Sequence, residues 1–406
     1  MSTARVPHHI GLYLAGVQFF FAVSWIVYAL YLPQLAEQAG LTRKAVPWLL
    51  MMDQVVFLLC DFAVGVSSDR AAAVLGRLGR WVLGATLVSS AAFLALPWLA
   101  PQGSPGLFVA ITVVWAITSS ALRAPPLTLL GRYAAKPSQP WLVALSLLGL
   151  GVAGALAPFI GLQLKPLDPR VPFLLSAAAL AAVTLGMVAA ERSLARQAGA
   201  LAVVPSGSPV LSVPPALERQ RPVTAVPGFL LAAVLAALAF QVHAFVTSAP
   251  LYLRHVPASE LPHLMPVFWI GFNLCMMPAS LATRHFGALP VMAAGALVAA
   301  AAAALAWQAG SLALLMATQA LAGAAWATLL MSAFSAALFF GHTGREGRFS
   351  GALSSVLALA ALSRLALLAW QPPPQPAAAA DWGWLPVLGF LAGASLLWAM
   401  WSRSRS

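Results

Sequence analysis

The ionisable side chains inside long apolar stretches of this sequence include Asp53, Asp61, Arg123 and His243. Charged residues make up only 8% of the chain, so these positions are unusual. An ionised aspartate at the centre of a membrane helix costs about 2.5–3.5 kcal/mol. Asp53 therefore either exchanges a proton with a water-filled cavity or forms a hydrogen bond to a neighbouring helix. All four residues are candidates for binding or sensing a proton or another cation.

Each of the other three residues also has two interpretations. Asp61 lies two turns beyond Asp53 and Arg123 lies at a similar depth in another apolar stretch, so the two can form an ion pair. Alternatively, Asp61 takes part in a contact at the end of its helix, and Arg123 extends toward water or binds substrate. His243 is a protonation candidate because imidazole titrates near neutral pH, but it can equally be a hydrogen-bonded structural histidine.

The elements that position these residues follow from composition. The 406 residues are 61% hydrophobic, and mean hydropathy is +0.88. A bilayer core needs about 20 apolar residues per helix. Polar, Pro-rich and Gly-rich breaks divide the chain into twelve such stretches, near 10–35, 45–66, 79–100, 107–131, 140–163, 171–191, 227–253, 262–283, 288–308, 311–340, 349–370 and 383–402. The sequence therefore predicts an all-α membrane protein with 12 transmembrane helices.

Positive charge predicts the orientation. With the N-terminus inside, fifteen of the 22 Lys and Arg residues fall on the cytoplasmic side and five on the other, which favours cytoplasmic termini and a cell (inner) membrane location.

The basic balance does not indicate nucleic-acid binding, because no soluble basic domain is present. Both cysteines fall inside predicted helices and suggest neither a disulfide nor a metal site. Arg364 lies in the outer part of its helix, where extension of the side chain toward the outer surface is expected.

The longest polar break divides the chain into two halves. Residues 192–226 are rich in Pro and Ser and read as a cytoplasmic linker between a six-helix bundle at 1–191 and a second at 227–406. Ala29-Leu30-Tyr31-Leu32 is echoed by Pro250-Leu251-Tyr252-Leu253. This repeat and the 6 + 6 division suggest two pseudo-symmetric halves, as in the major facilitator fold.

The loop at residues 67–80 concentrates charge at the cytoplasmic end of the second helix. Asp61, Gly65 and Asp69 recur every four residues and share one helix face, where Gly65 permits a close helix approach. Asp69 can cap a neighbouring helix N-terminus. We expect Gly65, Asp69, Arg70 and Arg77 to form a cytoplasmic gate.

These residues also carry a family resemblance. Gly65-x-x-x-Asp69-Arg70 resembles the loop signature of the major facilitator superfamily. The longer run from Asp61 through Ser68 to Gly76-Arg77 and Trp81 is similar to glycoside–pentoside–hexuronide cation symporters and sucrose transporters. Residues 15–19 (AGVQF), Tyr31, the spacing of Ile26-Val27-Tyr28 to Gly40-Leu41, and Pro125 agree with this group.

The resemblance covers about the first 130 residues and includes departures. Phe21 stands where melibiose permeases have a sugar-binding aspartate, and Phe57 replaces the first of their two cation-binding aspartates, whereas Asp61 matches the second. Ala116 and Leu127 replace the acidic residue and the arginine that sucrose transporters have in the fourth helix. The resemblance therefore supports the transporter architecture more strongly than a sugar substrate.

In this superfamily the first, fourth, seventh and tenth helices line the cavity. The resemblance therefore places a substrate site among Gln18, Phe21, Trp25, Tyr28 and Gln241, and Asn273 of the eighth helix is expected to supply a further hydrogen bond. Aromatic rings there can stack on a substrate ring, and amides can form hydrogen bonds to it.

The function expected is secondary active transport by alternating access. The leading expectation is proton- or sodium-coupled symport of a neutral polar, sugar-like solute by a monomer in the lipid bilayer, with no cofactor. Efflux of an amphiphilic organic compound by proton antiport is the alternative, and a membrane assembly or receptor role is a further one. No P-loop, HExxH or GxSxG motif is present, so no catalytic residues and no enzyme activity are expected.

Overall fold

The computed structural model describes residues 8–74, 77–134, 136–202, 222–342, 344–370 and 381–403. These residues contain helices and no strand, and twelve helices are long and apolar enough to cross a membrane. The predicted all-α class with twelve spans is therefore confirmed. Gly76 and the middle of the predicted linker, residues 203–221, lie outside the described part of the chain.

Six spans come from the first half of the chain. They are α1 (His8–Gln38), η1 with α2 (Arg43–Ala45 and Val46–Ala72), α3 (Arg77–Leu99), the broken span α4, η3 and α5 (Pro105–Ser119, Ser120–Leu122 and Pro125–Tyr133), α6 (Gln139–Leu164), and α7 with α8 (Arg170–Thr184 and Met187–Ala202). The α8 helix extends past residue 192, so the predicted linker begins inside a helix.

Six more spans come from the second half. They are the span formed by α10, η5 and α11 (Pro222–Val242, His243–Thr247 and Ser248–Leu253), α12 with α13 (Leu261–Leu264 and Pro266–Phe286), α14 (Ala288–Trp307), α15 (Leu312–Phe340), α16 (Glu346–Trp370) and α18 (Trp384–Arg403). The η5 segment is a π-helix.

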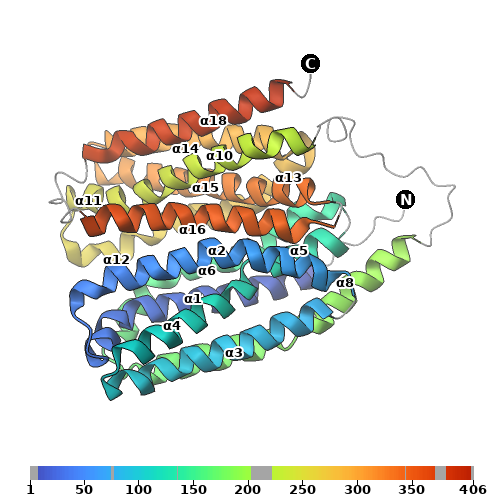
Figure 1. The fold of residues 1–406 in the computed structure, drawn as a ribbon. Helices are drawn as coiled ribbons and strands as arrows, with labels where there is room; N and C mark the ends of the chain where they lie inside the picture. The colour runs from blue at the N-terminus through green and yellow to red at the C-terminus, as the bar shows by residue number, and fades with distance from the viewer. Residues whose placement is uncertain are drawn as a thin grey trace.

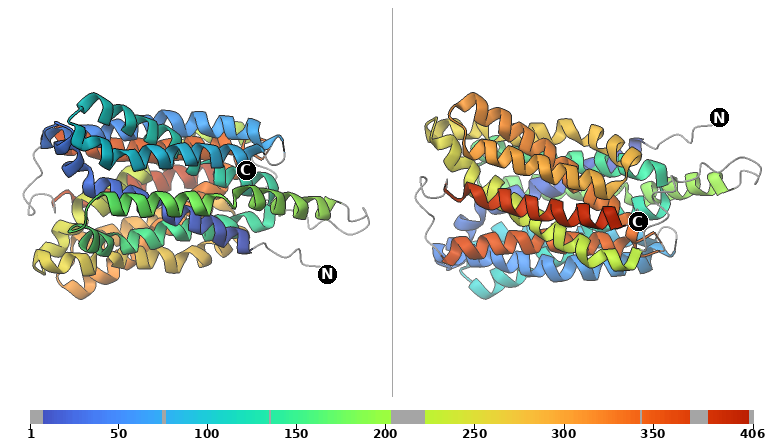
Figure 2. Two further views of the ribbon diagram at one scale, coloured as in Figure 1. Left: turned by 90° about the horizontal axis from the view of Figure 1, so that it is seen from below. Right: turned by 90° about the horizontal axis from the view of Figure 1, so that it is seen from above.

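The spans form one elongated bundle (Figures 1 and 2). The α1 helix begins and α18 ends at the same end of the bundle, on the right in Figure 1, which we call the terminal end. This agrees with an even number of spans.

The halves meet along two antiparallel helix pairs. The α2 helix packs on α16, as Figure 1 shows, and α6 packs on α13. These are spans 2 and 11, and spans 5 and 8. Exchanging the two halves converts one pair into the other, so the interface has the pseudo-symmetry predicted from the sequence.

Candidate functional site

Asp53 is buried in α2 and forms a hydrogen bond with α1. The Tyr28 hydroxyl donates to Asp53 Oδ2 over 2.8 Å, and neither side chain has solvent exposure. Asp53 Oδ1 has no hydrogen-bond partner among the described residues. The carboxyl group therefore has one oxygen held and one oxygen available to carry a proton or contact an ion.

Aromatic rings surround this hydrogen bond. Trp115 of α4 lies 4.4 Å from Tyr28 between ring centroids, and Trp25 of α1 stacks on Trp115 at 5.7 Å. Phe57 and Phe93 continue the cluster. Trp25 and Tyr28 thus pack against each other, with their ring centroids 5.5 Å apart.

Asp61 forms an ion pair with Arg123. Asp61 is fully buried, and its Oδ2 lies 2.8 Å from Arg123 Nε. The Arg123 guanidinium carbon also lies 4.6 Å from the centroid of the Phe57 ring, and the side chain is 20% exposed. The pair offsets the cost of each charge inside the membrane while keeping the arginine accessible.

A helix break positions Arg123. Pro125 and Pro126 have no backbone N–H, so α4 ends, the chain passes through the short η3 helix and α5 starts at Pro125. Pro126 leaves the Leu122 carbonyl without its intrahelical donor. Gln18 Nε2 of α1 donates to this carbonyl over 2.9 Å. Gln18, predicted to bind substrate, is therefore engaged with the backbone.

His243 contacts a residue that the sequence analysis did not select. His243 Nε2 lies 3.1 Å from Oε1 of Gln319 in α15, and both residues are buried. His243 begins the π-helix η5, and such bulges are frequent at functional sites. Gln319 Nε2 has no partner among the described residues. An uncharged amide in an apolar span gives little sequence signal.

Gln241 binds Arg364 of α16. Arg364 Nε donates to Gln241 Oε1 over 2.8 Å, and the guanidinium lies 5.0 Å from the centroid of the Phe245 ring. The head group of Arg364, expected to extend toward the outer surface, thus lies against the adjacent span.

Two predicted substrate residues lie apart from these contacts. Asn273 is in the α6–α13 pair, beside Gly151, and its Nδ2 donates to Trp269 of its own helix over 2.8 Å. Phe21 is partly buried against the main hydrophobic core. The predicted substrate residues thus belong to several separate contacts.

At the terminal end Asp69 bridges the halves. Its two carboxylate oxygens accept hydrogen bonds from the backbone N–H groups of Gly347, over 2.6 Å, and Arg348, over 2.8 Å. Asp69 thereby caps α16, because these donors have no intrahelical acceptor. A Cβ on Gly65 would collide with the Gly347 carbonyl, so glycine is required for this helix crossing.

Arg70 and Arg77 are exposed at the same end and form no ion pair within the described residues. A buried acid that the sequence analysis did not select lies nearby. Glu191 Oε2 of α8 accepts from the Gly79 N–H of α3 over 2.8 Å. Glu191 caps α3 as Asp69 caps α16. Because Glu191 is the last residue of the predicted span 171–191, nothing in the sequence indicated that it is buried.

Hydroxyl pairs repeat in the two halves. Ser68 of α2 lies 3.0 Å from Thr128 of α5, and Thr283 of α13 lies 2.9 Å from Ser332 of α15, as Oγ-to-Oγ1 distances. These helices are spans 2 and 4, and spans 8 and 10. The equivalent contacts support the internal repeat.

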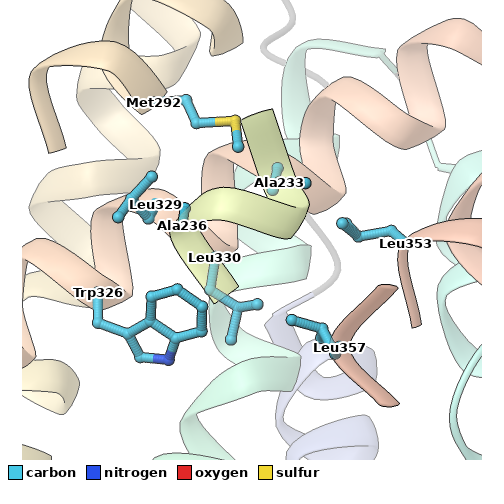
Figure 3. A pocket seen from close by; sticks show the side chains of 9 residues that line it. Ala233, Ala236, Met292, Trp326, Leu329, Leu330, Leu353 and Leu357 are labelled. Atoms are coloured by element: carbon cyan, nitrogen blue, oxygen red, sulfur yellow. The ribbon is translucent and has the colours of Figure 1, made fainter. Parts of the chain in front are cut away.

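A small cavity within the second half has about 10 Å³ of space for the centre of a water molecule, so it holds about one water molecule. Its lining is apolar: Ala233, Ala236, Met292, Trp326, Leu329, Leu330, Ala333, Leu353 and Leu357 (Figure 3). A second hollow, in the first half, has no room for a water molecule and is lined by Ser24, Ser89, Ser90, Phe93, Trp115, Ala177 and Leu180. The described residues include no cluster of three or more His, Cys, Asp or Glu side chains that could hold a metal ion.

No protein-family model and no curated protein matches the sequence. Solved structures do match over nearly the whole chain. The human organic anion transporter MFSD10 is 16% identical, with 98% of this chain and 100% of that chain covered and a TM-score of 0.65. A bacterial homologue of the iron transporter ferroportin, in an outward-facing state, is 13% identical, with 97% and 99% covered and a TM-score of 0.70.

The E. coli fucose:proton symporter FucP is 13% identical, with 99% of this chain and 98% of that chain covered and a TM-score of 0.63. FucP is a major facilitator superfamily transporter. Together with the twelve spans and the two related halves, these matches show that the chain has the major facilitator fold.

Proposed function

We propose that this protein is a secondary active transporter that works by alternating access and is coupled to a proton or another cation. The observation that carries this proposal is the Asp69 cap on α16, which joins the two halves at the terminal end. This contact can break while each half keeps its internal hydrogen bonds. The halves can then rock about a site between them.

Coupling is assigned to buried acids in α2. Asp53 has one free carboxylate oxygen, and Asp61 is paired with the partly accessible Arg123. Uptake of a proton by Asp61 would weaken its attraction to Arg123, which lies within the break of the fourth span, between η3 and α5. Arg123 can thereby transmit the protonation of α2 to the fourth span. His243 is the corresponding candidate in the second half.

The proposed setting is a monomer in the cell (inner) membrane, with the terminal end in the cytoplasm. The excess of Lys and Arg on that side supports this orientation. Asp69, Gly65, Arg70 and Arg77 then form the cytoplasmic gate, and the segment between the bundles is the cytoplasmic linker. A membrane assembly or receptor role remains the non-transport alternative.

The leading substrate class is a neutral polar, sugar-like solute taken up by symport. The sequence resemblance to glycoside–pentoside–hexuronide symporters supports it, and FucP, which has the same fold, is a fucose:proton symporter. Sugar recognition needs several free hydrogen-bonding groups beside an aromatic ring.

The second candidate, efflux of an amphiphilic organic compound by proton antiport, is favoured by a specific observation. Gln18 is bound to a backbone carbonyl, Gln241 to Arg364, and the side chains that line the small cavity of the second half are apolar. These features fit an amphiphile better than a sugar.

The test is solute exchange in proteoliposomes containing the purified protein, with empty liposomes as the control. A panel of radiolabelled neutral sugars and amphiphiles is offered on one side. Saturable, protein-dependent movement of a panel compound is the expected result, and its class separates the two candidates. If no compound moves faster than in empty liposomes, transport is contradicted and the receptor role gains support.

A further inference from the structure

Glu191 is a buried carboxylate that joins the ends of several membrane spans. It has no solvent exposure. Its Oε2 atom accepts a hydrogen bond from the backbone N–H of Gly79 in α3 over 2.8 Å, and its Oε1 atom lies 3.5 Å from the Tyr133 hydroxyl of α5. The same hydroxyl donates to the backbone carbonyl of Ala72 in α2 over 3.0 Å. Glu191 of α8 and Tyr133 therefore link spans 2, 3, 4 and 6 at the terminal end.

These contacts hold both sides of the connection between α2 and α3. Ala72 is the last residue of α2, and Gly79 lies in the first turn of α3. The last carbonyls and the first N–H groups of a helix have no partner within that helix. Tyr133 supplies the donor for the carbonyl, and Glu191 supplies the acceptor for the N–H, where the helix dipole also favours negative charge. Both contacts involve backbone atoms, so they fix the path of the chain itself.

The helices α3 and α8 pack together at the terminal end (Figure 1). A Cβ on Gly79 would lie 2.8 Å from the Cα of Val188 and 3.0 Å from Glu191 Oε2. Glycine therefore brings the two backbones into close contact, as small residues do between membrane helices. The packing of α3 on α8 thus sets the position of the Glu191 carboxylate.

The turn of α2 that Tyr133 holds also carries Asp69. Asp69 lies three residues before Ala72, which is about 4.5 Å along the helix. Its two carboxylate oxygens accept hydrogen bonds from the N–H groups of Gly347, over 2.6 Å, and Arg348, over 2.8 Å. Hydrogen bonds of this kind require a narrow range of distances and angles. Displacement of the last turn of α2 would therefore break the contact between the halves without any change in Asp69 itself.

The α5 helix packs against the same turn of α16. Gly131 lies two residues before Tyr133, and a Cβ on Gly131 would lie 2.9 Å from the Cγ of Glu346. Glu346 is the first residue of α16 and precedes Gly347. The first turn of α16 is thus contacted by α2 through Asp69 and by α5 at Gly131. Because Tyr133 joins α2 to α5, it holds these two contacts in a fixed relationship.

The second half has no counterpart of Glu191 in its last span. In that half spans 8 and 9, which are α13 and α14, are joined through Gly287 alone, which has a φ of 92°. The last span, α18, contains no acidic residue. The same arrangement of spans therefore forms without a carboxylate in this position, which indicates that Glu191 serves the half that carries Asp69.

We propose that Glu191 is a positioning residue of the cytoplasmic gate. Together with Tyr133 it holds the ends of α2 and α3 so that Asp69 meets the N–H groups of α16. Loss of its contacts frees the last turn of α2 and shifts the protein toward opening of the terminal end. This assignment rests on the proposed transport function and adds a residue to its gate.

The test measures the ratio of closed to open molecules. Electron spin-echo distances are recorded between labels at the exposed His9 and His342, in protein that lacks Cys60 and Cys275 and is reconstituted in liposomes without solute. We expect Glu191→Ala to shift the ratio toward the open form by about threefold, which is less than the loss of the Asp69 cap itself.

Further variants separate positioning from a merely structural role. Tyr133→Phe should shift the ratio in the same direction, and Glu191→Gln, which keeps an acceptor oxygen, should shift it less than Glu191→Ala. Once Asp69→Ala has removed the cap, Glu191→Ala should leave the ratio nearly unchanged, because residues that act through one contact do not add their effects. Glu37→Ala, which removes an exposed carboxylate at the opposite end of the bundle, is the control.

The proposal is overturned if Glu191→Ala and Tyr133→Phe both keep the wild-type ratio, even with a lowered melting temperature. It is also overturned if Glu191→Ala shifts the ratio equally with and without Asp69. Tyr133→Phe keeps the aromatic ring, so it decides the question if Glu191→Ala does not fold. The distances are measured without solute, so failure of transport in proteoliposomes leaves this result standing. Transport by the wild type together with unchanged ratios in the variants refutes only this assignment.

Discussion

The Oδ1 atom of Asp69 lies 2.6 Å from the backbone nitrogen of Gly347, so a carboxylate from the first half of the chain caps a helix of the second half. Negative charge at a helix N-terminus is stabilised by the exposed N–H groups and by the helix dipole. Because this contact joins the halves at one end of the bundle, its removal reports directly on closure there.

Replacing Asp69 with alanine should favour opening of the terminal end. Loss of a helix cap costs about 1 kcal/mol, which changes the ratio of closed to open molecules about fivefold. Electron spin-echo distances between labels at the exposed Lys136 and His342 measure the change. Ser67→Ala is the control, because Ser67 is exposed and bonds only its own helix. An unchanged distance distribution in Asp69→Ala would show that the cap does not hold the halves together.

A methyl group at Gly65 should weaken the α2–α16 crossing. A Cβ there would meet the Gly347 backbone carbonyl and the Gly351 Cα, neither of which can rotate away. We expect Gly65→Ala to destabilise the protein by about 1–3 kcal/mol, the usual cost of overpacking. Gly84→Ala is the matched control, since nothing lies within 4 Å of a Cβ at that position. Thermal unfolding in detergent measures both variants, and equal melting temperatures would contradict the close crossing.

The Asp61–Arg123 pair should show strong coupling in a double-mutant cycle. Asp61→Asn or Arg123→Gln alone leaves one charge without its partner inside the membrane, which costs about 3–5 kcal/mol. The double variant should recover much of that loss. The exposed pair Arg43–Glu37, with side chains 79% and 57% exposed, provides the comparison and should couple by about 0–1 kcal/mol. Additive effects at Asp61 and Arg123 would show that the pair contributes no net attraction.

Gln18 should matter less when Pro126 is removed. Gln18→Leu leaves the Leu122 carbonyl without a donor and should cost about 1–3 kcal/mol. In Pro126→Ala the restored backbone N–H can supply that hydrogen bond, so the same substitution should then cost less. Chemical denaturation of the four proteins measures the difference. An identical loss in both backgrounds would indicate that Gln18 acts elsewhere, including at a substrate.

The features that depend on how deep a residue lies in the membrane could be predicted from the sequence. Twelve apolar stretches give twelve spans, because a bilayer fixes the length of each helix. The second and fourth spans run in the same direction, and counting residues along them places Asp61 and Arg123 at a similar depth in the membrane. The ion pair between these two residues could therefore be suggested from the sequence. The capacity of Asp69 to cap a helix follows from the loop chemistry.

Contacts set by helix rotation could not be predicted in this way. Tyr28 reaches Asp53, and Gln241 reaches Arg364, only because neighbouring helices turn the relevant faces toward each other. The bond between Gln18 and Leu122 had an overlooked signal, since Pro126 frees the carbonyl four residues earlier. The prediction that Gln18 binds substrate does not account for this carbonyl.

Proton movement in proteoliposomes tests the central claim most directly. The wild-type protein, Asp53→Asn and Asp61→Asn are reconstituted, and a solute gradient is applied while a trapped dye reports internal pH. We expect a solute to drive proton flux in the wild type and one substitution to abolish that flux while solute binding survives, which would identify the coupling carboxyl group. If both variants move protons like the wild type, or if no solute moves protons at all, proton coupling through α2 is contradicted.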